Sequence, residues 1–378
     1  MQTILVLNSG SSSLKLKVID LESDTTVFEL NISETTRNFS YELVLTQAIN
    51  KLKEHMAVSP IELDAVAHRV VHGGELFTAP VLITEAVIGE IEKLIPLAPL
   101  HLPGNLAGIQ MCLDKFPDVP QVALFDTAFH KDLPDYAYLY PLPKQWRTEY
   151  GIRKYGFHGA SHGYLAVTTA KAMQQPVHSL NLITLHLGNG ASLCAIRKGI
   201  SVDTSMGFTP VAGVMMGTRS GDLDPIIPLY VQHSSGMGQD EVNNKLTAES
   251  GLEAVCGSHD MREILSRMHC GDVDAKLAVD MFVYRVRKAI GEYMVVLGHV
   301  DAIVFSGGIG ENCSEIRVRC CENLERFGIC LDEEKNNQFL NGQCQISSDE
   351  SLTGIFVINT NEEYQLAQQT RLYLSNFS

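Results

Sequence analysis

The sequence predicts an α/β fold, and a weak internal sequence repeat favours two related lobes. Short apolar runs that end in polar or glycine-rich clusters alternate with segments of helical periodicity, a pattern typical of α/β proteins. A shift of 179 positions superposes two segments that both read as strand, small-residue turn and strand, placing Ile4 on Ile183 and Ser13-Leu14 on Ser192-Leu193. Any two hairpins can look alike, so this simpler explanation stays open. The length of 378 residues fits two domains or one large one.

Six apolar runs are predicted to be strands. In chain order they are Ile4–Leu7, Ala65–Ala67, Val122–Phe125, Leu182–Leu185, Ala302–Phe305 and Phe356–Ile358. Ligands of open α/β sheets bind beyond the carboxyl ends of the strands. We therefore expect the functional residues in the polar clusters that follow these runs.

Two helices are predicted between the strands. The first covers Glu85 to Ile95, and the second covers Asp274 to Leu297 and is apolar on most sides. Its most regular stripe is Leu277, Met281, Tyr284, Lys288 and Gly291. A helix of this kind is buried in a core or in an oligomer contact.

The composition argues against several classes of protein. With 29 basic and 44 acidic residues the net charge is −15, which is unfavourable for nucleic-acid binding driven by counterion release. No run of 18 uninterrupted apolar residues predicts a membrane span. The nine cysteines include no C-x-x-C pair, and the chain begins without the pattern of a signal peptide. We expect a cytoplasmic protein with reduced thiols.

Two turns rich in small residues are candidate phosphate-binding hairpins, Asn8–Lys15 and His186–Ser192. They offer hydroxyl and amide donors and backbone that a phosphate can approach closely. An ordinary polar turn is the alternative for the first of them. Neither is a Walker A loop, because G-x-x-x-x-G-K-[ST] occurs nowhere in the chain.

Charged side chains follow other runs. Arg69 is followed along the chain by the pair Gly73-Gly74, and Arg219 lies between Gly217 and Gly221. Either arginine could bind a carboxylate or phosphate, although a surface ion pair is the simpler alternative for a single arginine. Asp126 directly follows a predicted strand. It could orient Mg²⁺ through water, hold a catalytic arginine, or cap a helix.

His158 and His162 are four residues apart, a spacing that can bind a metal ion. The zincin signature needs Glu after the first His, and Gly159 stands there. A histidine that donates to an oxyanion is therefore favoured over zinc, with Ser161 or His162 opening the next helix. The segment Ser306–Asn312 follows a strand and is a candidate site for a nucleotide, but it lacks the third glycine of the dinucleotide fingerprint.

These clusters together predict ATP-dependent transfer to a small anion. In order and spacing they resemble the acetate kinase family, from Ile4 to about Glu363. The motifs that carry the resemblance are Asn8–Lys15, His68–Gly74, Phe125–His130, Tyr155–Gly159, His186–Gly190, Gly217–Arg219 and Gly308–Asn312.

The resemblance implies the actin-like ATPase (ribonuclease H-like) fold, with two duplicated α/β lobes around a central cleft, usually as a homodimer. The first lobe would be residues 1–128 with 362–378, carrying the first hairpin and the carboxylate substrate. The second would be residues 129–361, carrying the second hairpin and the nucleotide. The stretch from Lys15 to Arg69 is shorter than is common in the family, which puts peripheral elements of the first lobe in doubt but not the chemistry.

The implied activity is reversible, Mg²⁺-dependent phosphoryl transfer from ATP to acetate, giving acetyl phosphate and ADP. The implied catalytic residues are Arg69, Asp126, His158 and Arg219, of which His158 and Arg219 stabilise the transition state. Asn8 and Glu362 would serve Mg²⁺, for which Mn²⁺ can substitute. Acetate would meet Arg69 and an apolar pocket of Val71, Leu100, Phe157 and Pro210. The implied ATP contacts are Lys15, His186, Gly188, Asn189, Gly190, Asp260, Met261, Arg262, Gly308, Ile309, Gly310 and Asn312, and His101 completes the phosphate surroundings.

Three rival interpretations stay open. A propionate or butyrate kinase would use the same mechanism on a larger acid. A non-catalytic nucleotide switch of the same superfamily would bind ATP, but it would not need the set of Arg69, His158 and Arg219. A metal hydrolase built on His158 and His162 is the most distant alternative.

Overall fold

The computed structural model describes residues 2–9, 13–33, 41–59, 61–339 and 341–376, so Gly10–Ser12 of the first predicted hairpin lie outside the described residues. The chain folds as two compact units. Unit 1 comprises Met1–Lys131 and Asn361–Ser378, and unit 2 comprises Asp132–Thr360. The functions expected of each lobe, and the lobe boundaries at 128/129 and 361/362, stay a prediction.

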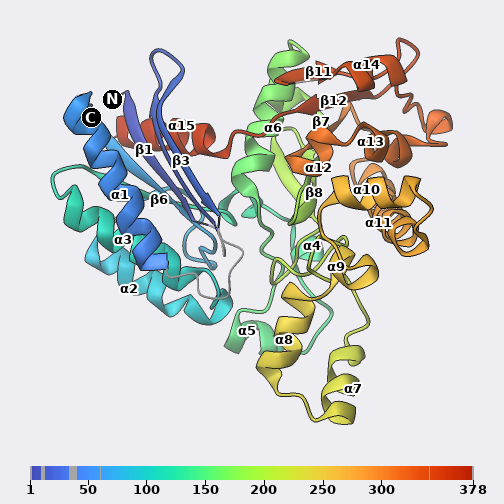
Figure 1. The fold of residues 1–378 in the computed structure, drawn as a ribbon, viewed down its shortest axis with the longest axis horizontal. Coiled ribbons are helices and arrows are strands. Elements are labelled where there is room, and N and C mark those ends of the chain that lie inside the picture. The colour runs from blue at the N-terminus through green and yellow to red at the C-terminus, as the bar shows by residue number, and fades with distance from the viewer. Residues whose placement is uncertain (1, 10–12, 34–40, 60, 340, 377–378) are drawn as a thin grey trace. The chain divides into compact units, whose positions relative to one another are not determined.

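Unit 1, which carries the labels α1, α2, α3 and α15 in Figure 1, is built on a six-stranded sheet with the order β3-β2-β1-β4-β6-β5. The strands are β1 (Thr3–Ser9), β2 (Ser13–Asp20), β3 (Thr25–Ser33), β4 (Ala65–Val70), β5 (Val81–Leu82) and β6 (Gln121–Phe125). The helices are α1 (Tyr41–Val58), α2 (Glu85–Lys93), α3 (Leu102–Lys115) and α15 (Glu362–Ser375), with short 3₁₀ turns η1 (Ile95–Leu97) and η2 (Ala128–His130).

The apolar core of unit 1 forms on one side of its sheet, because every second residue of a strand faces the same side. Leu5 and Leu7 of β1 and Leu14 and Leu16 of β2 alternate along their strands, so they face the same side of the sheet, where they pack with apolar residues of α1 and α3. Helix α15 contacts β1, β4 and β6, which form the middle of the same sheet. The buried sheet therefore holds the ends of β1, β4 and β6 in fixed positions.

Unit 2 is built on a second six-stranded sheet with the order β11-β12-β10-β7-β8-β9. Its strands are β7 (Asn181–Leu187), β8 (Ala191–Arg197), β9 (Ile200–Thr204), β10 (Ala302–Ser306), β11 (Gln343–Gln345) and β12 (Gly354–Ile358). Its helices are α4 (Asp135–Tyr138), α5 (Lys144–Tyr150), α6 (Gly159–Ala172), α7 (Ile226–Ser235), α8 (Gln239–Ala248), α9 (Gly251–Cys256), α10 (Met261–His269), α11 (Val273–Leu297), α12 (Gly307–Asn312), α13 (Ser314–Cys321) and α14 (Glu333–Gln338), with η3 (Val177–Ser179) and η4 (Glu325–Phe327).

The two sheets repeat one topology, which confirms the predicted duplicated α/β fold. In unit 1 the antiparallel strands β3-β2-β1 are followed by the parallel strands β4 and β6. In unit 2 the antiparallel strands β9-β8-β7 are followed by the parallel strands β10 and β12. Each sheet ends in a short antiparallel strand, β5 or β11.

The predicted alignment of the two hairpins at a shift of 179 positions is wrong for the second strand of each hairpin. Leu7 pairs with Leu16 in the first hairpin, and His186 pairs with Ser192 in the second. If the first strands are aligned at the expected shift, Leu16 rather than Ser13 falls on Ser192. The reason is that eight residues separate the paired Leu7 and Leu16, whereas five separate the paired His186 and Ser192.

All six predicted strands and both predicted helices are present, with two local corrections. Asn8, Arg69 and His186 lie inside β1, β4 and β7 rather than beyond them, because backbone pairing continues through these polar residues. Helix α6 begins at Gly159, two residues before Ser161, because His158 adopts a left-handed conformation (φ 58°) and serves as the N-cap.

The stripe chosen on α11 is the exposed side of that helix. Leu277 and Tyr284 are 51% and 63% exposed, whereas Phe282, Val286 and Ile290 are buried. A helix that is apolar on most sides gives no unique buried stripe. The predicted core position of α11 is confirmed for its opposite face, and an oligomer contact of the exposed stripe stays a prediction. Among the described helices, none combines the length and the apolar character needed to cross a membrane.

Candidate functional site

In unit 1, Arg69 is fixed by residues from two neighbouring strands. Parallel pairing places Asn8 of β1 opposite Arg69 of β4, and β6 ends at Phe125, directly before Asp126. Arg69 Nε and Nη2 donate to Asp126 Oδ1 and Oδ2 at 2.9 and 2.5 Å, and Arg69 Nη1 donates to Asn8 Oδ1 at 2.9 Å. The guanidinium is therefore held on three of its nitrogens.

Arg69 stays a cation although its side chain is largely buried. Its side chain is 14% exposed and that of Asp126 is 2% exposed. Burial opposes the charge of the guanidinium, but Asp126 and Glu362 outweigh burial and raise the pKa of Arg69. Unit 1 thus presents a fixed positive charge at the end of its central strands.

The first turn of α15 contributes two glutamates to this region. Asn361 caps the helix by accepting from Tyr364 N at 3.1 Å. Asn8 Nδ2 donates to Glu363 Oε1 at 2.7 Å and to Glu362 Oε2 at 3.2 Å. Glu363 is buried, and Lys15 and Lys17 approach its carboxylate at 3.8 and 3.6 Å. Lys15, expected at ATP, therefore pairs with a glutamate that the sequence analysis did not assign.

The side chains around Asn8 suit a Mg²⁺ ion that keeps several of its waters, rather than a metal ion whose ligands all come from the protein. The described residues contain no group of three or more His, Cys, Asp or Glu side chains that could hold a metal ion. Mg²⁺ commonly keeps several waters and binds one or two carboxylates together with substrate phosphates. Glu362 is partly exposed and suits that role. Asn8 turns its amide nitrogen to Glu362 and its oxygen to Arg69, which suits a residue that orients both.

In unit 2, the imidazoles of His158 and His186 lie side by side with ring centroids 4.3 Å apart. His158 Nδ1 hydrogen-bonds Ser192 Oγ at 2.8 Å, and His186 Nδ1 hydrogen-bonds Ser161 Oγ at 2.8 Å. With Nδ1 held by a serine in both rings, Nε2 faces the turn that joins β7 and β8. A Cβ atom on Gly190 would lie 3.4 Å from His158 Nε2, and one on Gly188 would lie 4.0 Å from His186 Nε2.

Arg219 reaches the same turn from the loop that precedes α7. A Cβ on Gly190 would lie 3.5 Å from Arg219 Nη1, and that nitrogen also donates to Pro210 O at 3.0 Å. The loop approaches Asn189 closely, because Gly217 N donates to Asn189 O at 3.0 Å. A Cβ on Gly217 would lie 3.3 Å from Asn189 O and would overlap the Asn189 side chain, so a larger residue there would displace that side chain from its present position. Unit 2 therefore brings His158, His186 and Arg219 to one turn.

His162 does not form a metal pair with His158. Its Nδ1 hydrogen-bonds Thr184 Oγ1 at 2.8 Å and its Nε2 hydrogen-bonds Ser192 Oγ at 2.9 Å, and the side chain is buried. A ligating histidine must offer a nitrogen lone pair to the metal, and both nitrogens of His162 already face hydroxyl groups. The geometry thus argues against a metal hydrolase.

The segment after β10 lies against the same turn. Gly307 has φ 74°, and a Cβ there would lie 2.7 Å from Leu187 O. Glu311 Oε1 accepts from Gly307 N at 2.9 Å and from Thr360 N at 3.0 Å, which ties the segment to the end of β12. A Cβ on Gly188 would lie 3.8 Å from Gly308 N.

The predicted nucleotide contacts in this segment differ in how far they are exposed to solvent. Gly308 and Asn312 are exposed at α12, whereas Ile309 and Gly310 are buried. Asn312 Nδ2 donates to Gly308 O at 2.9 Å. The buried residues of this segment can therefore offer a ligand little beyond their backbone.

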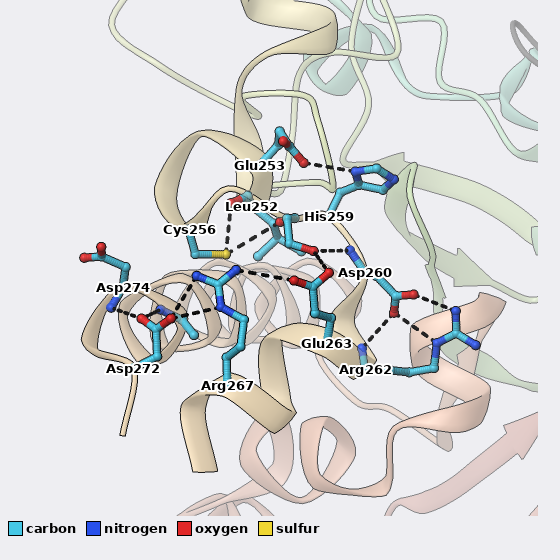
Figure 2. A network of polar contacts seen from close by, with 12 residues as sticks. Leu252, Glu253, Cys256, His259, Asp260, Arg262, Glu263, Arg267, Asp272 and Asp274 are labelled. Carbon is cyan, nitrogen blue, oxygen red and sulfur yellow. Dashed lines mark hydrogen bonds and ion pairs between the residues drawn. The ribbon is translucent and has the colours of Figure 1, made fainter. Parts of the chain in front are cut away.

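Figure 2 shows the second predicted nucleotide segment, at the start of α10. Asp260 caps the helix and accepts from Arg262 Nε and Nη2 at 3.0 and 2.6 Å. The hydrogen bond from Arg262 outweighs burial and lowers the pKa of Asp260 to about 2. Arg262 is 82% exposed and Met261 is buried, so the ion pair and not the Met261 side chain is available to a ligand.

The structure brings Arg69 and Asp126 together in unit 1, and His158 and Arg219 together in unit 2. The residues of the predicted apolar pocket are divided between the two units, and the pocket stays a prediction. Val71 and Phe157 are buried, whereas Leu100 is 61% exposed. His101 precedes α3. Sequence reasoning assigned no role to Glu363, Ser192 or Thr184, which support Asn8, His158 and His162 through hydrogen bonds. A serine and a threonine inside strands carry no signal that distinguishes them from ordinary strand residues.

Comparison with known proteins gives a consistent result. The model of the Acetokinase family matches residues 30–368. An acetate kinase of Sulfurovum sp. (strain NBC37-1) is 48% identical over 398 residues, which cover 99% of this chain and 100% of that protein. An acetate kinase of Sulfurimonas denitrificans is 47% identical and covers 98% of this chain and 99% of that protein.

Solved structures agree with these relatives. Porphyromonas gingivalis acetate kinase has a TM-score of 0.90 at 36% identity and covers 99% of this chain and 100% of its own. A propionate kinase from Francisella tularensis subsp. tularensis has a TM-score of 0.89 at 39% identity, with coverage of 98% and 99%.

Proposed function

The chain belongs to the acetokinase family, and from this premise we propose that it transfers a phosphoryl group reversibly from ATP to acetate, giving acetyl phosphate and ADP. The observation that carries the proposal is the buried pair of Arg69 and Asp126, hydrogen-bonded at 2.9 and 2.5 Å. This pair holds the guanidinium in a fixed orientation. Asp126 and Asn8 accept from three of its five N–H groups, and the remaining two, one each on Nη1 and Nη2, can donate to the oxygens of a carboxylate or phosphoryl group.

The acceptor needs no general base. Acetate is already ionised at neutral pH, so a carboxylate oxygen can attack the γ-phosphorus directly. A new P–O bond to acetate forms while the bond from phosphorus to the bridging oxygen of ADP breaks, and ADP leaves with that oxygen. The main demand on the protein is to position the two reactants and to stabilise charge on the transferring group.

We assign Arg69 to the acceptor carboxylate and to the charge of the phosphoryl group, with Asp126 orienting it. His158 and Arg219 are proposed to stabilise the equatorial oxygens of the in-line transition state. Their support is that both approach Gly190, at 3.4 and 3.5 Å from a Cβ position on that glycine. Donors fixed before the reaction stabilise developing charge without reorganising.

Mg²⁺, with Mn²⁺ as a substitute, is proposed to be held through water by Glu362, which Asn8 orients. When bound, the metal would neutralise charge on the phosphates of ATP. The proposed ATP contacts are the turn Gly188–Gly190 with His186, the segment Gly308–Asn312, and Asp260 to Arg262. The exposed ion pair of Asp260 and Arg262 supports the last of these. Lys15 is proposed to act near the phosphates while paired with Glu363.

The apolar end of the acid is proposed to meet Val71, Leu100, Phe157 and Pro210. One methylene contributes only about 0.8 kcal/mol of transfer free energy, so discrimination against propionate should be modest. Propionate is therefore the second candidate substrate, and the structural similarity to a propionate kinase favours weighing it.

The activity can be tested by measuring ADP formation from Mg-ATP with acetate, propionate and butyrate, and trapping the acyl phosphate with hydroxylamine. The proposal predicts a hydroxamate product and the highest kcat/KM with acetate. A higher value with propionate or butyrate would keep the mechanism and change the substrate. A folded protein that binds ATP but yields no acyl phosphate would instead support a nucleotide switch.

We also propose a homodimer in the cytoplasm. Helix α7 exposes Ile226, Leu229 and Tyr230 at 61%, 60% and 68%, a cluster of large apolar side chains that a second copy could cover. All nine cysteines are free thiols, which suits a reducing compartment. Sedimentation analysis of the wild type and of a Leu229→Glu variant would test the dimer. A monomeric wild type would refute it.

A further inference from the structure

A chain of buried hydrogen bonds runs from His158 into the core of unit 2. His158 Nδ1 contacts Ser192 Oγ at 2.8 Å, and the same oxygen contacts His162 Nε2 at 2.9 Å. His162 Nδ1 in turn contacts Thr184 Oγ1 at 2.8 Å. Ser192, His162 and Thr184 are all fully buried. The side chains come from helix α6 and from the adjacent strands β7 and β8, whose pairing fixes their spacing.

When both imidazoles are neutral, the hydrogen bonds of this chain can run in either of two directions, which differ in which atom of each pair donates the proton. Ser192 has one hydroxyl proton and lies between two ring nitrogens, so it can donate to only one of them. If it donates to His158, then His162 Nε2 must carry a proton and His162 Nδ1 must accept from Thr184. If it donates to His162, then His158 Nδ1 carries the proton and His162 Nδ1 donates to Thr184.

Thr184 decides between the two directions. Among the residues that the structure describes, its Oγ1 has one hydrogen-bond partner, His162 Nδ1. In the first direction the threonine proton lies in that bond and every group in the chain is satisfied. In the second direction Thr184 accepts there, and its own proton is left buried without an acceptor, which is costly. The first direction is therefore favoured.

We propose that Thr184, His162 and Ser192 are positioning residues that fix His158 as the tautomer protonated on Nε2. The consequence for catalysis rests on the function proposed above. His158 Nε2 faces the turn at Gly190, so this tautomer presents an N–H donor there, whereas the other would present a lone pair to a phosphoryl oxygen. A neutral ring can then act as donor without first being protonated.

The tautomer can be observed directly. The full-length protein labelled with ¹⁵N-histidine is studied by NMR without substrate, and the His158 signals are assigned by their loss in His158→Gln. Long-range ¹H–¹⁵N correlation distinguishes a protonated from an unprotonated ring nitrogen. The proposal predicts protonated Nε2 and unprotonated Nδ1. Protonation of Nδ1 instead would overturn it, whether or not the protein makes acyl phosphate, and a protein without kinase activity but with the expected tautomer would refute only the proposed function.

Variants of Thr184 test the control of the tautomer. Thr184→Val keeps the shape but removes the donor, and Thr184→Ser keeps the hydroxyl. We expect Thr184→Val to give a mixture of His158 tautomers and to lower kcat about tenfold with KM values little changed, and Thr184→Ser to behave like the wild type. The matched control is Thr169→Val, because Thr169 is a buried threonine of α6 whose hydroxyl donates to Leu165 O outside this chain.

A merely structural role would give a different pattern. Thr169→Val and Thr184→Val would then lose similar stability, and both would leave the His158 spectrum unchanged. That result would overturn the proposal. If Thr184→Val does not fold, the wild-type and Thr184→Ser spectra still decide the outcome.

Discussion

Replacing Asp126 by asparagine should disable Arg69 while leaving the sheet of unit 1 folded. The Asp126 carboxylate receives two hydrogen bonds from Arg69, at 2.9 and 2.5 Å, and its side chain is 2% exposed. An asparagine can accept only one of these bonds, and its amide N–H groups would then face a guanidinium N–H. Both the ionic attraction and the bidentate geometry are lost.

The magnitude follows from what remains around Arg69. Removing one partner of a buried ion pair typically costs about 3–5 kcal/mol of unfolding free energy. Arg69 keeps its hydrogen bond to Asn8 and the attraction of Glu362 and Glu363, so we expect the lower end of that range, about 3 kcal/mol. A catalytic group that is misplaced by about 1 Å loses roughly 10²-fold in rate, which sets the expected fall in kcat.

The assay combines chemical denaturation with steady-state kinetics for Asp126→Asn, Arg69→Ala and the double variant. The exposed Asp118 gives a matched control, because Asp118→Asn makes the same chemical change outside the site. The coupled pair predicts that the double variant loses less stability than the sum of the single losses. An Asp126→Asn variant as stable and active as Asp118→Asn would show that this pair does not fix Arg69.

Three further predictions concern charge, pH and metal. Arg219→Ala should lower kcat by ~10³-fold with an unchanged circular dichroism spectrum, and a near-normal kcat would remove Arg219 from the mechanism. Burial lowers the pKa of His68 and His72 to about 4, against 6.5 when exposed, so the unfolded chain binds more protons between these values. Stability should therefore fall as pH drops through this window, by about 2 kcal/mol for each histidine between pH 7 and pH 5, and His68→Gln should weaken the dependence measured by denaturation. Chelation of Mg²⁺ should abolish acyl phosphate formation but leave the unfolding free energy unchanged, and a large loss of stability would indicate a structural metal instead.

The strands were predictable because their apolar runs are short and end sharply at polar residues. The hydrogen bond between Asn8 and Arg69 was not, because it depends on strand order, which places β1 directly beside β4. Apolar patterning identifies strands but does not say which of them are neighbours. The family resemblance implied the roles of Asn8 and Arg69, and the pairing of β1 with β4 in the structure shows why the two side chains are in contact.

The supporting residues were harder to predict for a different reason. Thr184 lies within the apolar run that forms β7, and Ser192 within β8, so the strand pattern alone describes both as ordinary buried positions. Their importance arises only when α6 places His158 and His162 against them. Glu363 was missed because two adjacent glutamates look alike in the sequence, and only the geometry of α15 buries the second.

The most direct test of the mechanism is the stereochemical course at phosphorus. ATP made chiral at the γ-phosphorus with three oxygen isotopes would be used to phosphorylate acetate, and the configuration of the acetyl phosphate would be determined. A single in-line attack by the carboxylate, with charge stabilised by Arg69, His158 and Arg219, predicts inversion. Retention would mean that a residue of the protein carries the phosphoryl group between two displacements, and it would contradict direct transfer.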